Sequence, residues 1–109
     1  MNKFEFRNYT LDLNIAGVKF SVNCAAELME NLEAHQAELR LLADEMVAGE
    51  KTSFDAISCC KAILEDLLGE TAFTRIFAGR EATLTNISDV LRFVVGEITM
   101  FLQNETVSE

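Results

Sequence analysis

The segment LDLNIAGVKFSV, residues 11–22, constrains the fold most, because it predicts two short strands joined by a tight turn. Apolar and polar residues alternate along it with the period of two that is typical of half-buried strands. If Ala16 and Gly17 form a two-residue loop, every apolar side chain falls on one face. The apolar pairs of this register are Leu11–Val22, Leu13–Phe20 and Ile15–Val18. A three-residue loop would spoil the match, so we predict the shorter loop although Ala16 is poorly suited to a type I′ turn.

The hairpin needs a partner, because two isolated strands are at best marginally stable in water. Its apolar face can pack on helices of the same chain, and its edges can pair with another chain. Phe4 and Phe6 have the opposite parity from Leu11, so we expect either a bulge near Asn8 or a separate edge segment. The strands have few partners elsewhere in the chain, so we expect at least one edge to be available for β-augmentation.

The remaining sequence has helical periodicity and contains no proline. A first helix is expected over residues 25–48, with Gly49 as its stop. Its apolar seam is formed by Leu28, Leu32, His35, Leu39, Leu42 and Met46. Thr52 and Asp55 predict a capping box for a second helix, which continues to Leu68 before Gly69. The buried stripe predicted for that helix is Phe54, Ile57, Cys60, Leu64 and Leu67.

A short third helix is expected over residues 71–78, and a longer fourth helix follows a polar loop. Asn86 is predicted to cap the fourth helix, with Asp89 in its first turn. The wide apolar face of that helix is formed by Ile87, Val90, Leu91, Val94, Ile98, Phe101 and Leu102. Gly96 lies inside it, where we expect it to permit close contact with another helix. The predicted fold is therefore mainly α with an N-terminal β-hairpin (α+β), the hairpin being followed by three to four helices.

A length of 109 residues suits a single domain. We divide it into a hairpin region (1–23), a helical region (25–103) and a frayed polar tail (104–109). The formal charge of −9 disfavours nucleic acid and anionic lipid as partners, and a basic protein surface fits better. No apolar run is long enough to span a membrane, and we expect no signal peptide. Three sparse cysteines indicate a reducing compartment, so we expect a cytoplasmic protein.

No residue pattern in the chain predicts catalysis or metal binding. His35 is the only histidine, and leucines surround it on its seam, which favours a packing or interface role. Cys59 and Cys60 lie about 100° apart around a helix, so they cannot chelate together as a CxxC pair does. The carboxylates off the seam of the first helix, Glu27, Glu30, Glu33 and Glu38, are typical of a solvated face. The sequence contains no GxSxG, P-loop, dinucleotide or HExxH motif, so we expect neither an enzyme nor a cofactor.

The chain resembles the tail assembly chaperone family of long-tailed phages, as found in small prophage proteins of Gram-positive bacteria. The resemblance covers the hairpin LDLNIAGVKFSV, the adjoining NCAAELMENLEAH and the C-terminal LEDLLGETAFTRIFAGREATLTNISDVLRFVVGEI. Its most specific part is GETAFTRIFAGRE followed by the last helix. Within this part, Arg75 and Arg80 bracket IFAG, where they either complement a helix C-terminus or meet an acidic partner.

The resemblance implies a non-enzymatic protein that binds the tape-measure protein and recruits tail-tube subunits during tail assembly in the bacterial host cytoplasm. It also implies that the protein leaves before the virion is complete. The alternatives are a structural tail-completion or connector subunit and a small dimeric adaptor or regulatory protein. We expect a homo-oligomer and nominate these residues for protein interaction: Leu11, Leu13, Phe20, Val22, His35, Phe73, Phe77 and Phe101.

Overall fold

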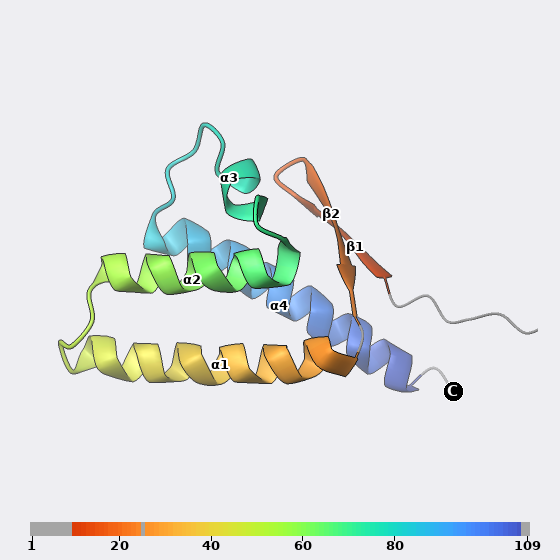
Figure 1. Cartoon of the computed structure of the whole chain (residues 1–109), viewed down its shortest axis with the longest axis horizontal. Coiled ribbons are helices and arrows are strands. Elements are labelled where there is room, and N and C mark those ends of the chain that lie inside the picture. The colour runs from red at the N-terminus through yellow and green to blue at the C-terminus, as the bar shows by residue number, and fades with distance from the viewer. Residues whose placement is uncertain (1–9, 25, 108–109) are drawn as a thin grey trace, which may run out of the picture.

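The computed structural model describes residues 10–24 and 26–107, which form a two-stranded antiparallel sheet and four helices (Figure 1). The strands are β1 (Thr10–Ile15) and β2 (Val18–Asn23), and the helices are α1 (Ala26–Val47), α2 (Ser53–Leu68), α3 (Ala72–Ile76) and α4 (Leu84–Val107). This element order confirms the predicted class, an N-terminal hairpin followed by helices. The segment containing Phe4, Phe6 and Asn8 lies outside the described residues.

The hairpin has the predicted register. Leu11 pairs with Val22, Leu13 with Phe20 and Ile15 with Val18. Both loop residues have positive φ, 54° at Ala16 and 86° at Gly17, as a type I′ turn requires. The side-chain oxygen of Asn14 accepts a hydrogen bond from the Gly17 N–H at 2.9 Å. The apolar register therefore prevails over the poor fit of alanine to a left-handed conformation.

Helix α1 ends where glycine allows a left-handed residue. Gly49 has φ 79°, and its N–H donates to the carbonyl of Met46 at 3.1 Å. The N–H of Glu50 donates to the carbonyl of Glu45 at 2.8 Å, which completes a Schellman motif. The next helix, α2, begins with the predicted capping box.

In that box, the Asp55 N–H donates to the Thr52 hydroxyl at 3.3 Å, while the Asp55 carboxylate accepts from the Thr52 N–H at 2.9 Å. The predicted buried stripe of α2 is wrong at its first member. Phe54 is 76% exposed, whereas Ala56 is buried. The two residues lie about 200° apart on the helix, so only Ala56 falls in line with the buried Cys60 and Ile63.

The start of α4 also differs from the prediction. Asn86 does not cap this helix, because α4 begins at Leu84 and the hydroxyl of Thr83 accepts the Asn86 N–H at 3.1 Å. The Asn86 amide instead donates to the carbonyl of Glu81 at 3.0 Å, which ties down the preceding loop. At its other end α4 continues to Val107 and so includes residues 104–107, which the sequence assigned to a polar tail.

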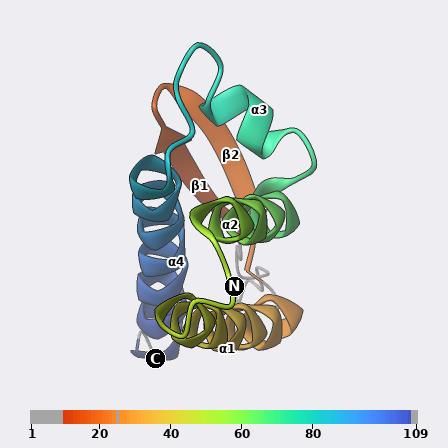
Figure 2. The ribbon, with the colours of Figure 1, turned by 90° about the vertical axis from the view of Figure 1, so that its left-hand side faces the viewer.

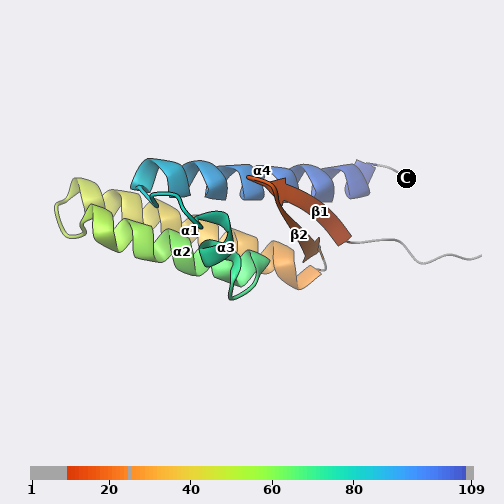
Figure 3. The same ribbon diagram turned by 90° about the horizontal axis from the view of Figure 1, so that it is seen from above.

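The helices are arranged in layers (Figures 2 and 3). Helices α2 and α4 run in the same direction and pack on each other most extensively. The hairpin and α3 cover one side of this pair, with β1 over α4 and β2 over α2. Helix α1 lies on the other side and runs antiparallel to α2. The largest fully buried side chains of the core are Ile63, Leu64, Ile87, Val94 and Ile98.

Candidate functional site

The hairpin residues nominated for protein interaction belong mostly to the core of this chain. Leu13, Phe20 and Val22 are buried, and Leu11 is half-buried. The apolar face of the hairpin packs on α2 and α4, which is one of the two arrangements expected for it. The buried side chains Leu13, Phe20 and Val22 therefore stabilise the fold of this chain.

The other nominated aromatic residues do not form one surface either. Phe77 is buried, and its ring centroid lies 5.1 Å from that of the half-buried Phe73. Phe101 is half-buried on α4. Arg75, in the last turn of α3, places its guanidinium carbon 4.8 Å from the ring centroid of Phe20. Arg75 thus joins α3 to the hairpin by a cation–π contact.

The edges of the hairpin remain a candidate for strand pairing. In the part of the chain that the structure describes, the sheet contains only β1 and β2. Neither outer edge of this sheet is covered by a further described strand. Edge pairing with another chain stays a prediction.

His35 connects α1 to α2. Its Nε2 lies 2.6 Å from a carboxylate oxygen of Asp66 on α2, and its Nδ1 lies 3.3 Å from a carboxylate oxygen of Glu38 on α1. The side chain is only 15% exposed. This geometry gives His35 a packing role between α1 and α2, whereas its nomination for protein interaction stays a prediction.

The three cysteines are free thiols with little nucleophilic character. Cys24 and Cys60 are buried and Cys59 is half-buried. Burial raises the pKa of each thiol, and the negative charge of Glu38 raises the pKa of Cys59 further. Because the thiolate is the reactive form, these groups are poorly suited to covalent catalysis at neutral pH. Among the described residues, no group of three histidines, cysteines or carboxylates is placed to hold a metal ion.

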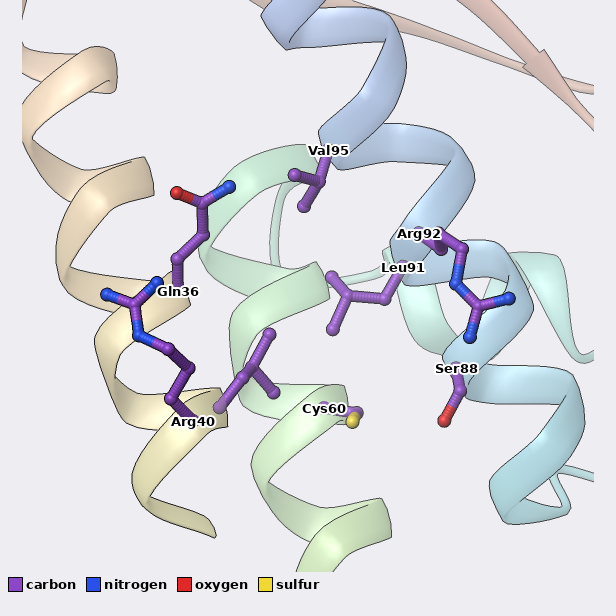
Figure 4. Close-up of a pocket in the computed structure, with 8 residues that line it drawn as sticks. Gln36, Arg40, Cys60, Ser88, Leu91, Arg92 and Val95 are labelled. Carbon is purple, nitrogen blue, oxygen red and sulfur yellow. The ribbon is translucent and has the colours of Figure 1, made fainter. Parts of the chain in front are cut away.

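An open concavity lies between α1 and α4. It consists of two adjoining cavities of about 440 and about 470 Å³, which share Gln36 as a lining residue. Helix α1 packs more closely on α2 than on α4, and Cys60 of α2 contributes to the lining of the first cavity. Figure 4 shows the first cavity, with Gln36 and Arg40 on the α1 side, Ser88, Arg92 and Val95 on the α4 side, and Cys60 between them. We call this concavity the α1–α4 groove.

The lining of the α1–α4 groove is apolar at its centre and polar at its rim. Its apolar side chains are Met29, Leu32, Leu39, Leu91, Val95 and Leu102. Gln36 and Thr99 lie along the rim, and the Thr99 hydroxyl is already bonded to the carbonyl of Val95 at 2.8 Å. An apolar trough with a polar rim suits the apolar face of an amphipathic helix.

Two further apolar side chains of α4 are uncovered. Phe93 is 43% exposed and Met100 is 59% exposed. Between them lies Gly96, where an added Cβ would meet no atom within 4 Å. The expected close helix contact at Gly96 is therefore absent among the described residues. At about 100° per residue, Gly96 lies next to the groove-lining positions Arg92 and Thr99 on the surface of α4.

Sequence reasoning did not locate this groove or name its two arginines. The α4 lining residues Ser88, Val95 and Thr99 form a weak stripe of small side chains beside the wide apolar face. That stripe is the one sequence signal that could have indicated an uncovered side of the helix. Whether such a stripe lines a groove depends on how far α1 lies from α4, and this distance cannot be inferred from the sequence pattern.

No protein-family model, curated protein or solved structure matches the chain. Among the described residues, no helix is both long enough and apolar enough to cross a membrane.

Proposed function

We propose that the chain is a non-enzymatic assembly chaperone that holds a helical segment of a client protein in the α1–α4 groove. The observation that carries this proposal is the open, largely apolar trough that residues of α1 and α4 line together. The resemblance to phage tail assembly chaperones supplies the client class. The tape-measure protein is the expected client, with tail-tube subunits as second partners, in the cytoplasm of the bacterial host.

The dimensions of the groove support a helical client. Its lining extends from Met29 to Arg40 along α1 and from Ser88 to Gln103 along α4. At 1.5 Å per residue these stretches are about 17 and about 22 Å long. Such a trough accommodates roughly three to four turns of an amphipathic helix. A long helical protein offers many such segments, so a chaperone of this kind can coat its client at repeated sites.

Co-expression with the client tests the proposal. A tail-tube gene upstream and a very long tape-measure gene downstream would identify the client. The tagged chain should then co-purify with the tape-measure protein. Gln36→Trp places a bulky side chain where the two cavities meet and should abolish co-purification. Leu41→Trp is the matched control, because Leu41 is 61% exposed and lines a different depression between α1 and α2.

Two results would contradict the proposal. Either the wild-type chain fails to retain the client, or Gln36→Trp and Leu41→Trp retain it equally. Mass spectrometry of purified particles separates the structural alternative. A chaperone should be missing from finished tails, whereas a connector or tail-completion subunit should be present in fixed proportion.

A further inference from the structure

Two arginines line one end of the α1–α4 groove. Arg40 on α1 and Arg92 on α4 line the same cavity, from opposite sides (Figure 4). The chain has 18 acidic and 9 basic residues, so two cations at one cavity are unusual for this surface. In the described part of the chain no carboxylate lines the cavity, whose remaining lining residues are neutral: Gln36, Leu39, Cys60, Ser88, Leu91 and Val95.

Among the residues that the structure describes, neither arginine has a strong partner. Arg92 lies 3.8 Å from a carboxylate oxygen of Asp89, but both side chains are largely exposed, at 81% and 64%. Exposed pairs three residues apart on one helix contribute a few tenths of a kcal/mol. Among the described residues, no carboxylate lies within ion-pair distance of Arg40. The two guanidinium groups therefore remain available to bind an anionic group from outside.

We infer that the α1–α4 groove selects a client helix that carries carboxylates at the end lying between Arg40 and Arg92. This inference rests on the proposed function, since it names the chemistry of the client segment. Guanidinium groups bind carboxylates through paired, charge-assisted hydrogen bonds, which a lysine or a neutral rim would not provide. The apolar face of the same helix covers Leu39, Leu91 and Val95 in the centre of the trough.

The other end of the groove gives the client a direction. The second cavity is lined by Glu33 together with neutral residues and has no basic residue. A helix with glutamates at both ends would meet this carboxylate, whereas a helix with glutamates at one end avoids it. The charge difference between Arg40 and Arg92 at one end and Glu33 at the other thus fixes the orientation of the helix. The net charge of −9 disfavours a uniformly acidic client in addition.

An amphipathic helix fits better than a small anionic ligand. Small-molecule sites usually enclose most of the surface of their ligand, whereas this trough lies open between α1 and α4. A fatty acid would also have the right chemistry, with its carboxylate at the arginines and its chain in the trough. The experiment therefore includes a fatty acid as a separate arm.

Designed helical peptides test the inference directly. Two fluorescent peptides of about 14 residues, or four turns, carry the same leucine stripe. They differ only at one end, where one has three glutamates and the other three glutamines. Fluorescence anisotropy should show that the wild-type chain binds the glutamate peptide about tenfold more tightly, as expected for charge-assisted hydrogen bonds. In the double variant Arg40→Glu and Arg92→Glu this preference should disappear.

Two further variants control for net charge and for folding. Arg80→Glu makes the same charge change at an exposed residue outside the α1–α4 groove, and it should keep the preference. Arg92→Gln removes one cation without reversing its charge and should reduce the preference partly. Circular dichroism should show the same helical content for all variants, because the three arginines are exposed.

The outcomes separate the inference from the proposed function. Equal binding of both peptides by the wild-type chain, or a preference that survives in the double variant, overturns the inference even if the client still co-purifies. Binding of laurate without binding of either peptide overturns it as well, since the groove would then be a fatty-acid site. A glutamate preference that depends on Arg40 and Arg92 supports the inference, and loss of the client in co-expression would then count against the proposed function alone.

Discussion

Replacing Phe20 with alanine should cost most of the stability that one core aromatic residue supplies. Phe20 is 6% exposed in the hairpin and packs in the core beneath the guanidinium of Arg75. Removal of a buried phenylalanine costs about 3–5 kcal/mol, which includes about 0.5–1 kcal/mol for the lost cation–π contact. Phe54→Ala is the matched control, because the same atoms are removed from a side chain that is 76% exposed. The control should change the free energy of unfolding by no more than about 0.5 kcal/mol.

Urea denaturation followed by circular dichroism measures both variants. With a denaturant slope of about 1–3 kcal/mol per molar, Phe20→Ala should lower the midpoint by about 2 M, and Phe54→Ala should leave it nearly unchanged. Because a domain of this size is stable by roughly 5–15 kcal/mol, Phe20→Leu serves as a milder variant if the alanine variant does not fold. Similar small effects of Phe20→Ala and Phe54→Ala would refute the assignment of the hairpin to the core. Phe20 would then again be a candidate for partner binding.

Three more predictions concern single residues. Gly96→Ala should raise the free energy of unfolding by about 1 kcal/mol in thermal or urea denaturation, because the added Cβ meets no atom within 4 Å and alanine favours the helix. Hydrogen bonds from the backbone N–H and the hydroxyl of Thr52 lower the pKa of Asp55 in the folded state. The ionised Asp55 therefore stabilises the fold at any pH above the pKa that this residue has in the unfolded chain. This stabilisation is lost as the pH falls through the lower pKa of the folded state. Asp55→Asn should therefore be less stable than wild type near neutral pH, and urea titrations in acid should show this difference vanish. With a thiol-specific disulfide reagent, the half-buried Cys59 should react before the buried Cys60. Both thiols should react slowly in the folded chain, because burial raises their pKa, and both should react faster once urea unfolds the chain.

The sequence predicts the hairpin well because its register has one apolar solution. A shift by one residue would move Leu13 and Phe20 to the solvent side, which no turn preference can offset. The ends of α1 and α2 are also predictable, since Gly49 and Gly69 both have positive φ at the stops expected of them. These features depend on residues close together in the chain.

The errors concern choices that depend on tertiary packing. Thr83 and Asn86 are both suitable capping residues, and the course of the loop after α3 decides in favour of Thr83. Phe54 has the apolar character of a core residue but lies on the side of α2 that no described element covers. The nominated hairpin residues were assigned to a partner because the sequence does not show that α2 and α4 already cover them. For the same reason the position of the α1–α4 groove could not be predicted, since the sequence does not show which helix faces stay uncovered.

Helix α4 carries features that weaken the isolated chain. A glycine in an exposed helix interior costs about 1 kcal/mol relative to alanine, and the exposed parts of Phe93 and Met100 contribute no burial. Such departures from an optimal monomer are common at functional surfaces. Of these three residues, Gly96 adjoins the groove-lining positions Arg92 and Thr99 on the surface of α4. A helix bound in the α1–α4 groove would therefore pass beside a position of α4 that has no Cβ and has open space around it.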